Sequence, residues 1–111
     1  MSDAFFSWLD RTTADARATP LGARMVAAGY GIDHTGGGCL AWAKTNAAGD
    51  CVWITYNDGI SLLPEGDETA EAAQWLVGLY LNNSDDEPQV AEVIGISAAL
   101  QQAETMLAVA P

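Results

Sequence analysis

The chain has 111 residues, half of them apolar, and a formal net charge of −11 at neutral pH. This length suits one domain and is too short for two, so we expect a single domain over residues 1–111. Four Trp, three Tyr and two Phe can fill a core, which excludes a disordered chain despite the charge. No run of apolar residues is long enough to span a bilayer, and acids stand where a secretion signal needs bases. We therefore expect a cytoplasmic location.

The first 30 residues predict two helices. The first, over about residues 3–14, has large apolar side chains within two turns. In the second, Thr19 can cap the N-terminus, Pro20 suits the first helical position and Gly29 can supply a left-handed stop. Residues 32–38, which include three consecutive glycines, are expected to form a loop.

Residues 39–63 predict a strand meander. Strands are expected at 39–45 and 51–57, and the "NDG" turn at 57–59 leads to a third strand at 60–63. In the simplest register Trp42 lies opposite Ile54, and Leu40 opposite Tyr56. Alternation then gives a core face and an opposite face with small residues that would let a helix or a partner approach closely. The core face holds Leu40, Trp42, Val52, Ile54 and Tyr56. The opposite face holds Cys39, Ala41, Ala43, Cys51, Trp53 and Thr55.

Two more strands and a last helix complete the expected fold. Alternating apolar residues predict strands at 74–81 and 89–95, although the first half of residues 67–83 also suits a helix. Ser97 can cap a final helix that turns Leu100, Met106 and Leu107 inward. The fold class is therefore α+β: an antiparallel meander of four to five strands, with N-terminal helices and a C-terminal helix packed on one face.

The two cysteines and the single histidine are the residues that could carry redox, catalytic or metal chemistry. In the predicted hairpin Cys39 and Cys51 lie about 20 Å apart, so free thiols are expected rather than a disulfide. A nucleophilic dyad of Cys39 with His34 is conceivable, but the acidic surroundings would raise the pKa of the thiol. The glycines of residues 29–38 fit neither a phosphate loop nor a dinucleotide fingerprint. Residues 82–93 lack the glycine and glutamate spacing of a helix-loop-helix calcium site. We predict no metal, no cofactor and no enzyme activity.

The charge is divided unevenly along the chain. Residues 1–44 hold four bases and four acids, whereas residues 45–111 hold eleven acids and neither Lys nor Arg. A field of one sign argues against direct binding to nucleic acid or to an anionic membrane, because both need cationic side chains. Either the acids only keep the protein soluble, or they form a site for a basic partner.

Acids cluster at both ends of the predicted strand 74–81, about 25 Å apart. Such spacing is compatible with two basic stretches of a groove that normally holds a nucleic-acid backbone, so the acids would act as a nucleic-acid mimic. An exposed aromatic residue, Trp53 or Tyr80, would supply the desolvated anchor. The residues predicted to bind a partner are Asp50, Asp58, Glu65, Asp67, Glu68, Glu71, Asp85, Asp86 and Glu87.

Over its whole length the chain resembles the small acidic proteins encoded by phages and prophages, among them the anti-CRISPR inhibitors. The resemblance rests on the length, the acid-only second half, the two thiols and the lack of a catalytic signature. It implies a phage protein, acting in the host cytoplasm, that inhibits a CRISPR effector complex by occupying a basic nucleic-acid channel or a protein-contact surface. Two alternatives stay open: a soluble homodimeric domain of unknown role, and a thiol-dependent hydrolase that uses Cys39 and His34.

Overall fold

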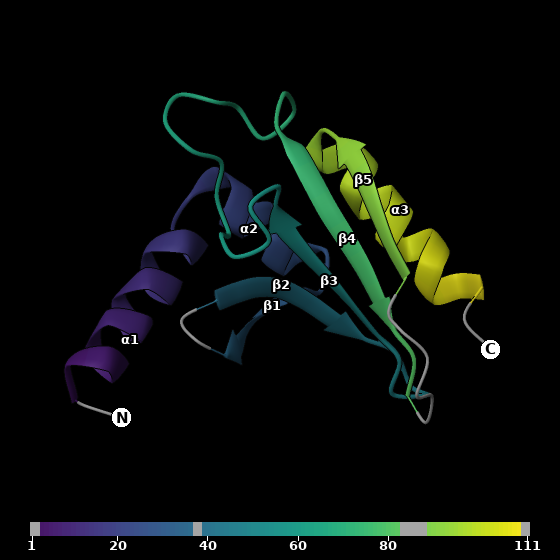
Figure 1. Ribbon diagram of the computed structural model, residues 1–111, viewed down its shortest axis with the longest axis horizontal. Helices are drawn as coiled ribbons and strands as arrows, with labels where there is room; N and C mark the ends of the chain where they lie inside the picture. Colours follow the sequence, from purple (N-terminus) through teal and green to yellow (C-terminus); the bar gives the residue numbers. More distant parts are fainter. Residues whose placement is uncertain (1–2, 37–38, 83–88, 110–111) are drawn as a thin grey trace.

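The computed structural model describes residues 3–36, 39–82 and 89–109. Within them the chain forms three helices and five strands. These are α1 (Asp3–Arg17), α2 (Pro20–Ala27), β1 (Gly31–Gly36), β2 (Cys39–Thr45), β3 (Cys51–Tyr56), β4 (Gln74–Tyr80), β5 (Gln89–Ile94) and α3 (Ile96–Val109). The strands make one antiparallel sheet in the order β1-β2-β3-β4-β5, a meander (Figure 1). The predicted α+β class, an antiparallel meander with N-terminal helices and a C-terminal helix, is confirmed.

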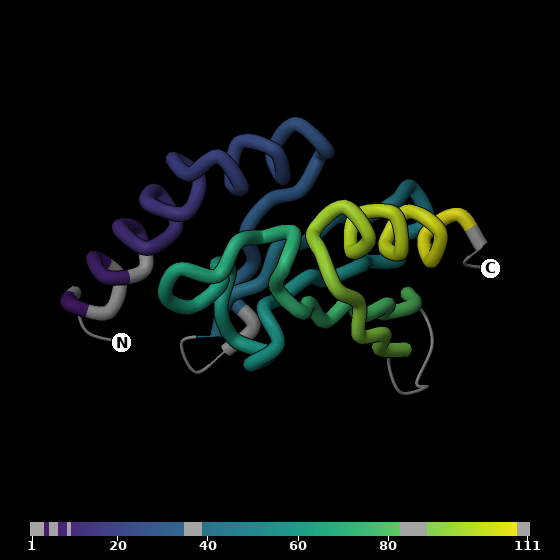
Figure 2. Tube along the Cα trace, turned by 90° about the horizontal axis from the view of Figure 1, so that it is seen from above, coloured from purple at the N-terminus to yellow at the C-terminus, as the bar shows by residue number. Residues whose placement is uncertain are grey.

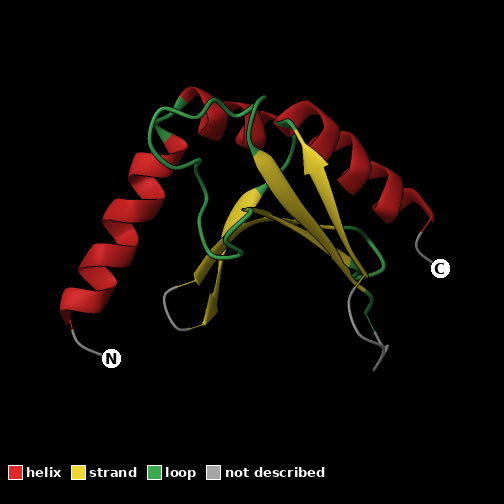
Figure 3. Ribbon diagram, turned by 45° about the horizontal axis from the view of Figure 1, so that its top comes forward, coloured by secondary structure: helices red, strands yellow, loops and turns green. Residues whose placement is uncertain are grey.

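The helices lie on the same side of the sheet, as Figures 2 and 3 show. Helix α3 packs on β3, β4 and β5, whereas α1 packs on α2 and reaches beyond the strands (Figure 1). The other side of the sheet carries no helix within the described part of the chain. We call that side the open face; by strand register and alternation it includes Ala41, Trp53, Thr55, Leu76, Gly78, Tyr80, Val90 and Glu92.

The core lies between the helices and the sheet. Trp42 and Trp75 are fully buried in it, and each indole N–H donates to a backbone carbonyl, that of Leu62 or of Ala70, at 2.9 Å. Trp42 pairs with Ile54, as the simplest register predicts. All five residues predicted for the core face are buried, so this prediction is confirmed.

The ends of α2 follow the sequence signals. The hydroxyl of Thr19 accepts the backbone N–H of Gly22 at 2.9 Å, Pro20 begins the helix, and Gly29 has a φ of 94° just beyond its end. Helix α1 is longer than predicted. Its Thr12 and Thr13 hydroxyls donate to the carbonyls of Trp8 and Asp10, which accommodates both residues inside a helix.

Two predictions between residues 32 and 63 are wrong. The expected loop at 32–38 instead begins as strand β1, because an edge strand pairs on one side only and tolerates glycine there. The expected strand at 60–63 is a bend. Its cause is Asp58, whose carboxylate accepts the backbone N–H groups of Ile60 and Ser61, both at 2.9 Å, and so withdraws them from a strand ladder.

The predicted cap of the last helix is also wrong. Helix α3 begins at Ile96, so Ser97 lies inside its first turn. The backbone N–H of Ser97 donates to the carboxylate of Glu71 at 2.9 Å. A side chain distant in sequence therefore supplies the acceptor that a capping residue normally provides.

Candidate functional site

Most of the described candidate acids lie on one long segment between β3 and β4, residues 57–73, which we call the β3–β4 connection. Connections of this length without secondary structure are uncommon in small domains. This one is fastened to the core, because Leu62 is buried and the carbonyls of Leu62 and Ala70 accept the indole N–H groups of Trp42 and Trp75. It is therefore an ordered support for the acids that it carries: Asp58, Glu65, Asp67, Glu68 and Glu71.

Asp58 shapes the first turn of the β3–β4 connection. Besides the two backbone N–H groups, its carboxylate accepts the hydroxyl of Ser61. Partial burial raises the pKa of Asp58, but these hydrogen bonds from Ser61 and Ile60 outweigh it, and the pKa lies below its usual value. The carboxylate is exposed and negatively charged at neutral pH, so it adds a fixed charge to the connection.

Glu65, Asp67 and Glu68 are exposed in the middle of the connection. The carboxylate of Glu68 accepts the hydroxyl of Tyr56. This hydrogen bond, with a smaller contribution from burial, raises the pKa of Tyr56. Glu68 is thus oriented by the sheet, which leaves Glu65 and Asp67 as the acids of this group most open to a partner.

Glu71 joins the connection to two helices. Its Oε1 atom accepts the backbone N–H and hydroxyl of Ser97, and it also pairs with Nη1 of Arg24 at 3.1 Å. The Ser97 hydrogen bonds and the Arg24 charge lower the pKa of Glu71 against the opposing effect of burial. Because Arg24 neutralises it, Glu71 supports the fold more than it adds to a negative surface.

Asp50 is placed differently from the other candidates. It is 3% exposed, and its carboxylate accepts the backbone N–H of Asn82 at 2.8 Å. A partner cannot reach this carboxylate in the structure as described. The last three candidates, Asp85, Asp86 and Glu87, lie outside the described residues.

The four bases of the chain all belong to the helical side. Arg11 and Arg17 are on α1 and Arg24 is on α2. Lys44 of β2 donates to the carbonyl of Ala28 at 3.1 Å and pairs with Glu104 of α3 at 2.7 Å. Within the part of the chain that the structure describes, Arg24 and Lys44 pair with acids, and none of the four bases belongs to the open face.

The open face holds the aromatic pair that the sequence suggested as an anchor. The rings of Trp53 and Tyr80 lie 4.5 Å apart, centroid to centroid. They border a groove of about 350 Å³ whose other residues include Leu76, Gly78 and Val90. Sequence analysis missed these three, although the alternation of Leu76, Gly78 and Tyr80 and the pairing of a glycine opposite a tryptophan are signals for such a groove.

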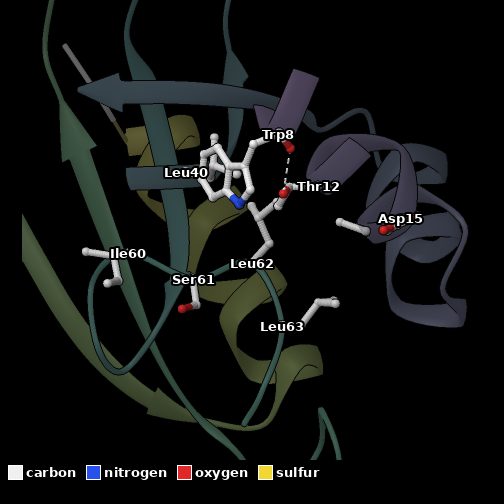
Figure 4. A pocket seen from close by; sticks show the side chains of 9 residues that line it. Trp8, Thr12, Asp15, Leu40, Ile60, Ser61, Leu62 and Leu63 are labelled. Atoms are coloured by element: carbon white, nitrogen blue, oxygen red, sulfur yellow. Dashed lines mark hydrogen bonds between the residues drawn. The ribbon is translucent and has the colours of Figure 1, made fainter. Parts of the chain in front are cut away.

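A second cavity, of about 430 Å³, lies between α1 and residues 60–63. Figure 4 shows Trp8 and Thr12 of α1 on one side and Ile60 to Leu63 on the other, with Leu40 of the sheet behind the Trp8 ring. Among the described residues that line it, Asp15 is the sole carboxylate, Thr12 and Ser61 carry hydroxyls, and the others are apolar. This lining suits apolar contact.

The pairing of β1 with β2 bears on whether Cys39 and His34 can act as a catalytic dyad. His34 pairs with Leu40, and Cys39 pairs with Gly36, so alternation directs His34 and Cys39 to opposite faces. Neither Cys39 nor Cys51 is in a disulfide bond. Among residues 3–36, 39–82 and 89–109, no group of three or more His, Cys, Asp or Glu is placed to hold a metal ion.

No family model, curated protein or solved structure matches this chain. No helix in the described ranges is long and apolar enough to cross a membrane.

Proposed function

We propose that the chain is a non-enzymatic inhibitor of phage origin that binds a basic surface of a host nucleic-acid machine, a CRISPR effector complex. The observation that supports this is the β3–β4 connection, a long segment fastened to two core tryptophans. It carries five acids and no base, and Glu65, Asp67 and Glu68 are exposed on it. Acids held on a fixed support lose little conformational freedom when they meet a basic partner.

The charge distribution favours protein binding over direct contact with nucleic acid. A phosphate backbone would be repelled by the acid-only segment, whereas a channel lined with Lys and Arg would be attracted to it. Complementary charge speeds association and makes the affinity depend on salt. Occupying a channel built for nucleic acid would be sufficient for inhibition, so no catalytic group is required.

The test is an in-cell interference assay. The chain is expressed in bacteria that carry active CRISPR systems of several types, each targeting a challenge phage, and plaquing efficiency is measured. We expect the wild type to restore plaquing against at least one system. The double variant E65Q/D67N should restore it about tenfold less, because it removes two exposed charges from the connection.

The matched control is D10N/D15N, which removes the same charge from two exposed residues of α1. It should inhibit as the wild type does, as should Cys39→Ser. The proposal fails if the wild type protects the phage from none of the systems, or if both double variants act alike. Loss of inhibition in Cys39→Ser would instead favour the thiol-dependent hydrolase.

A further inference from the structure

The groove on the open face is lined by small residues and by two aromatic side chains. Ala41 is fully buried at its base and Gly78 adds no side chain. The rings of Trp53 and Tyr80 contact each other at an interplanar angle of 39° and border the groove. Val90 of the edge strand β5 also lines it, with 61% of its surface exposed. A β-branched side chain this exposed beside an open groove is apolar area that a partner can bury.

Trp53 also differs from the buried tryptophans in its hydrogen bonding. The indole N–H groups of Trp42 and Trp75 each donate to a backbone carbonyl. The indole nitrogen of Trp53 is enclosed and has no acceptor among the described residues. An enclosed donor without an acceptor is destabilising. A small rotation of the ring toward a bound segment would give this donor a carbonyl partner.

The charges at the margins of the open face are negative. Asp33 on β1 pairs with Ala41, and Glu92 on β5 pairs with Leu76, so alternation puts both acids on this face, one on each edge strand. Both are exposed. Glu92 accepts a hydrogen bond from the side-chain amide of Gln74 at 2.9 Å. It has no basic partner there, because all four bases belong to the helical side.

Charge complementarity decides which occupant fits this face. A second copy of the chain, placed face to face, would bring further acids and no Lys or Arg, and each copy carries a net charge of −11. Like charges brought together in this way are destabilising. A segment that carries Lys or Arg together with apolar side chains would satisfy both the groove and its margin.

The spacing on β5 specifies the shape of that segment. Val90 and Glu92 are two residues apart on the same face, so their side chains are separated by about 7 Å along the strand. An extended peptide repeats side chains on one face at this same interval. A peptide that alternates apolar and basic residues along one face would therefore place an apolar side chain at Val90 and a basic side chain at Glu92.

We propose that the groove bordered by Trp53, Tyr80 and Val90 binds an extended, basic segment of a partner protein that places an apolar side chain in the groove and a Lys or Arg against Glu92. This proposal names the partner chemistry of the open face, and it rests on the proposed function only for the identity of the partner. The acids of the β3–β4 connection steer the partner, and the groove holds it.

The test uses a synthetic peptide with acetyl and amide ends, Leu-Thr-Lys-Thr-Leu-Thr-Lys-Thr-Leu, which places Leu and Lys on one face when extended. The matched control, Leu-Lys-Thr-Thr-Leu-Lys-Thr-Thr-Leu, has the same composition but places Leu and Lys on opposite faces. Binding is followed by NMR through the indole N–H resonances, with that of Trp53 assigned from Trp53→Phe. The resonances of Trp42 and Trp75 serve as internal references.

We expect the first peptide to shift the Trp53 resonance, to leave those of Trp42 and Trp75 in place, and to bind at least fivefold more tightly than the control peptide. Val90→Ser should weaken its binding about tenfold. Val26→Ser should not, because Val26 is 50% exposed on helix α2, on the helical side, and does not line the groove. Glu92→Gln should weaken binding about threefold, and Asp10→Asn should not.

Three outcomes would overturn the proposal. Equal binding of the two peptides would show attraction by charge alone. A Trp53 resonance that moves with protein concentration in the absence of peptide would show that a second copy occupies the face. A resonance that does not move with either peptide would show that the groove is not the site. Peptide binding without CRISPR inhibition would leave this proposal standing and remove only the proposed function.

Discussion

The carboxylate of Glu71 accepts both the backbone N–H and the hydroxyl of Ser97, at 2.9 and 2.8 Å. Arg24 completes the cluster, since its guanidinium pairs with Glu71 and donates to the Ser97 hydroxyl at 2.6 Å. The cluster ties the β3–β4 connection to the first turn of α3 and to α2. The acids ahead of Glu71 therefore project from a segment fixed at this end.

Glu71→Gln should lower the thermal unfolding temperature by a few degrees at neutral pH, because the variant loses charge from a helix N-terminus and from the pair with Arg24. The pKa of Glu71 is lowered in the folded state. Its stabilising effect is thus present above the unfolded-state pKa of about 4.3 and is lost as the pH falls through the lower folded-state pKa. Unfolding temperatures of wild type and variant should converge at acid pH. A difference that stays constant from pH 7 down to pH 2 would contradict this role.

Asp50 should act in stability and not in binding. Asp50→Ala leaves the N–H of Asn82 without its acceptor, so the free energy of unfolding should fall by about 1–3 kcal/mol. Asp50→Asn retains an acceptor oxygen and should cost less. Urea unfolding measures both. The control is Asp67→Asn at an exposed position, which should change the free energy of unfolding by less than about 0.5 kcal/mol. A change as small as this for Asp50→Ala would show that the hydrogen bonds of Asp50 do not stabilise the fold.

Tyr30→Phe should leave the protein as stable as the wild type or make it more stable. Tyr30 is 3% exposed, and its hydroxyl has no hydrogen-bond partner among the described residues, so removing the hydroxyl removes a desolvated polar group. Tyr56→Phe is the contrasting variant, because it breaks the hydrogen bond to Glu68. A loss of more than about 1 kcal/mol in Tyr30→Phe, measured in urea, would reveal a partner for the hydroxyl.

The ionisation of Tyr30 also predicts how the stability of the protein changes at alkaline pH. Burial, followed by the charges of Glu104 and Cys51, raises the pKa of Tyr30 well above its ordinary value. Ionisation of Tyr30 leaves stability unchanged below the unfolded-state pKa of about 10. Above it the unfolded state loses the proton first, so stability falls as the pH rises toward the higher folded-state pKa. Tyr30→Phe should therefore lose less stability than the wild type between pH 9 and pH 12, a comparison that thermal unfolding across this range provides. Parallel losses in the two proteins would contradict it.

Gly22→Ala should disrupt the contact between α1 and α2. A β-carbon at Gly22 would overlap the backbone carbonyl of Ala16, and backbone cannot move aside as a flexible side chain can. Overpacking of this kind costs about 1–3 kcal/mol. Gly31→Ala is the matched control, since nothing lies within 4 Å of the corresponding β-carbon. Equal unfolding free energies for the two variants would mean that α1 does not pack on α2 as described.

The hairpin of β2 and β3 could be predicted from sequence because each of its signals agrees. Residues 39–45 alternate large and small side chains, residues 51–56 place Val52, Ile54 and Tyr56 on one face, and a turn separates the two segments. The same logic found β4 and β5. Sequence pattern did not predict β1, because its glycines are typical of a loop. It also wrongly predicted a strand at residues 60–63, where the side chain of Asp58 accepts the backbone N–H groups that a strand would use.

The candidate site was harder to predict, since charge alone does not separate a surface acid from a structural one. Asp50, Glu71 and Asp67 look alike in sequence, yet Asp50 is buried, Glu71 is paired with Arg24, and Asp67 is exposed. The partners that make the difference, Asn82 and Arg24, are distant along the chain. The open-face groove depends in the same way on pairing between strands, which sets Gly78 beside Trp53.

The most direct test of charge-led binding is a tagged pull-down from a CRISPR-bearing bacterial lysate, eluted with a rising salt ladder and identified by mass spectrometry. Wild type and E65Q/D67N are compared side by side, with D10N/D15N as the control. We predict that the wild type and the control retain a nucleic-acid-binding complex that is released between moderate and high salt, and that E65Q/D67N releases it at lower salt. Recovery of the chain alone, with the same behaviour at every salt concentration, would contradict the account.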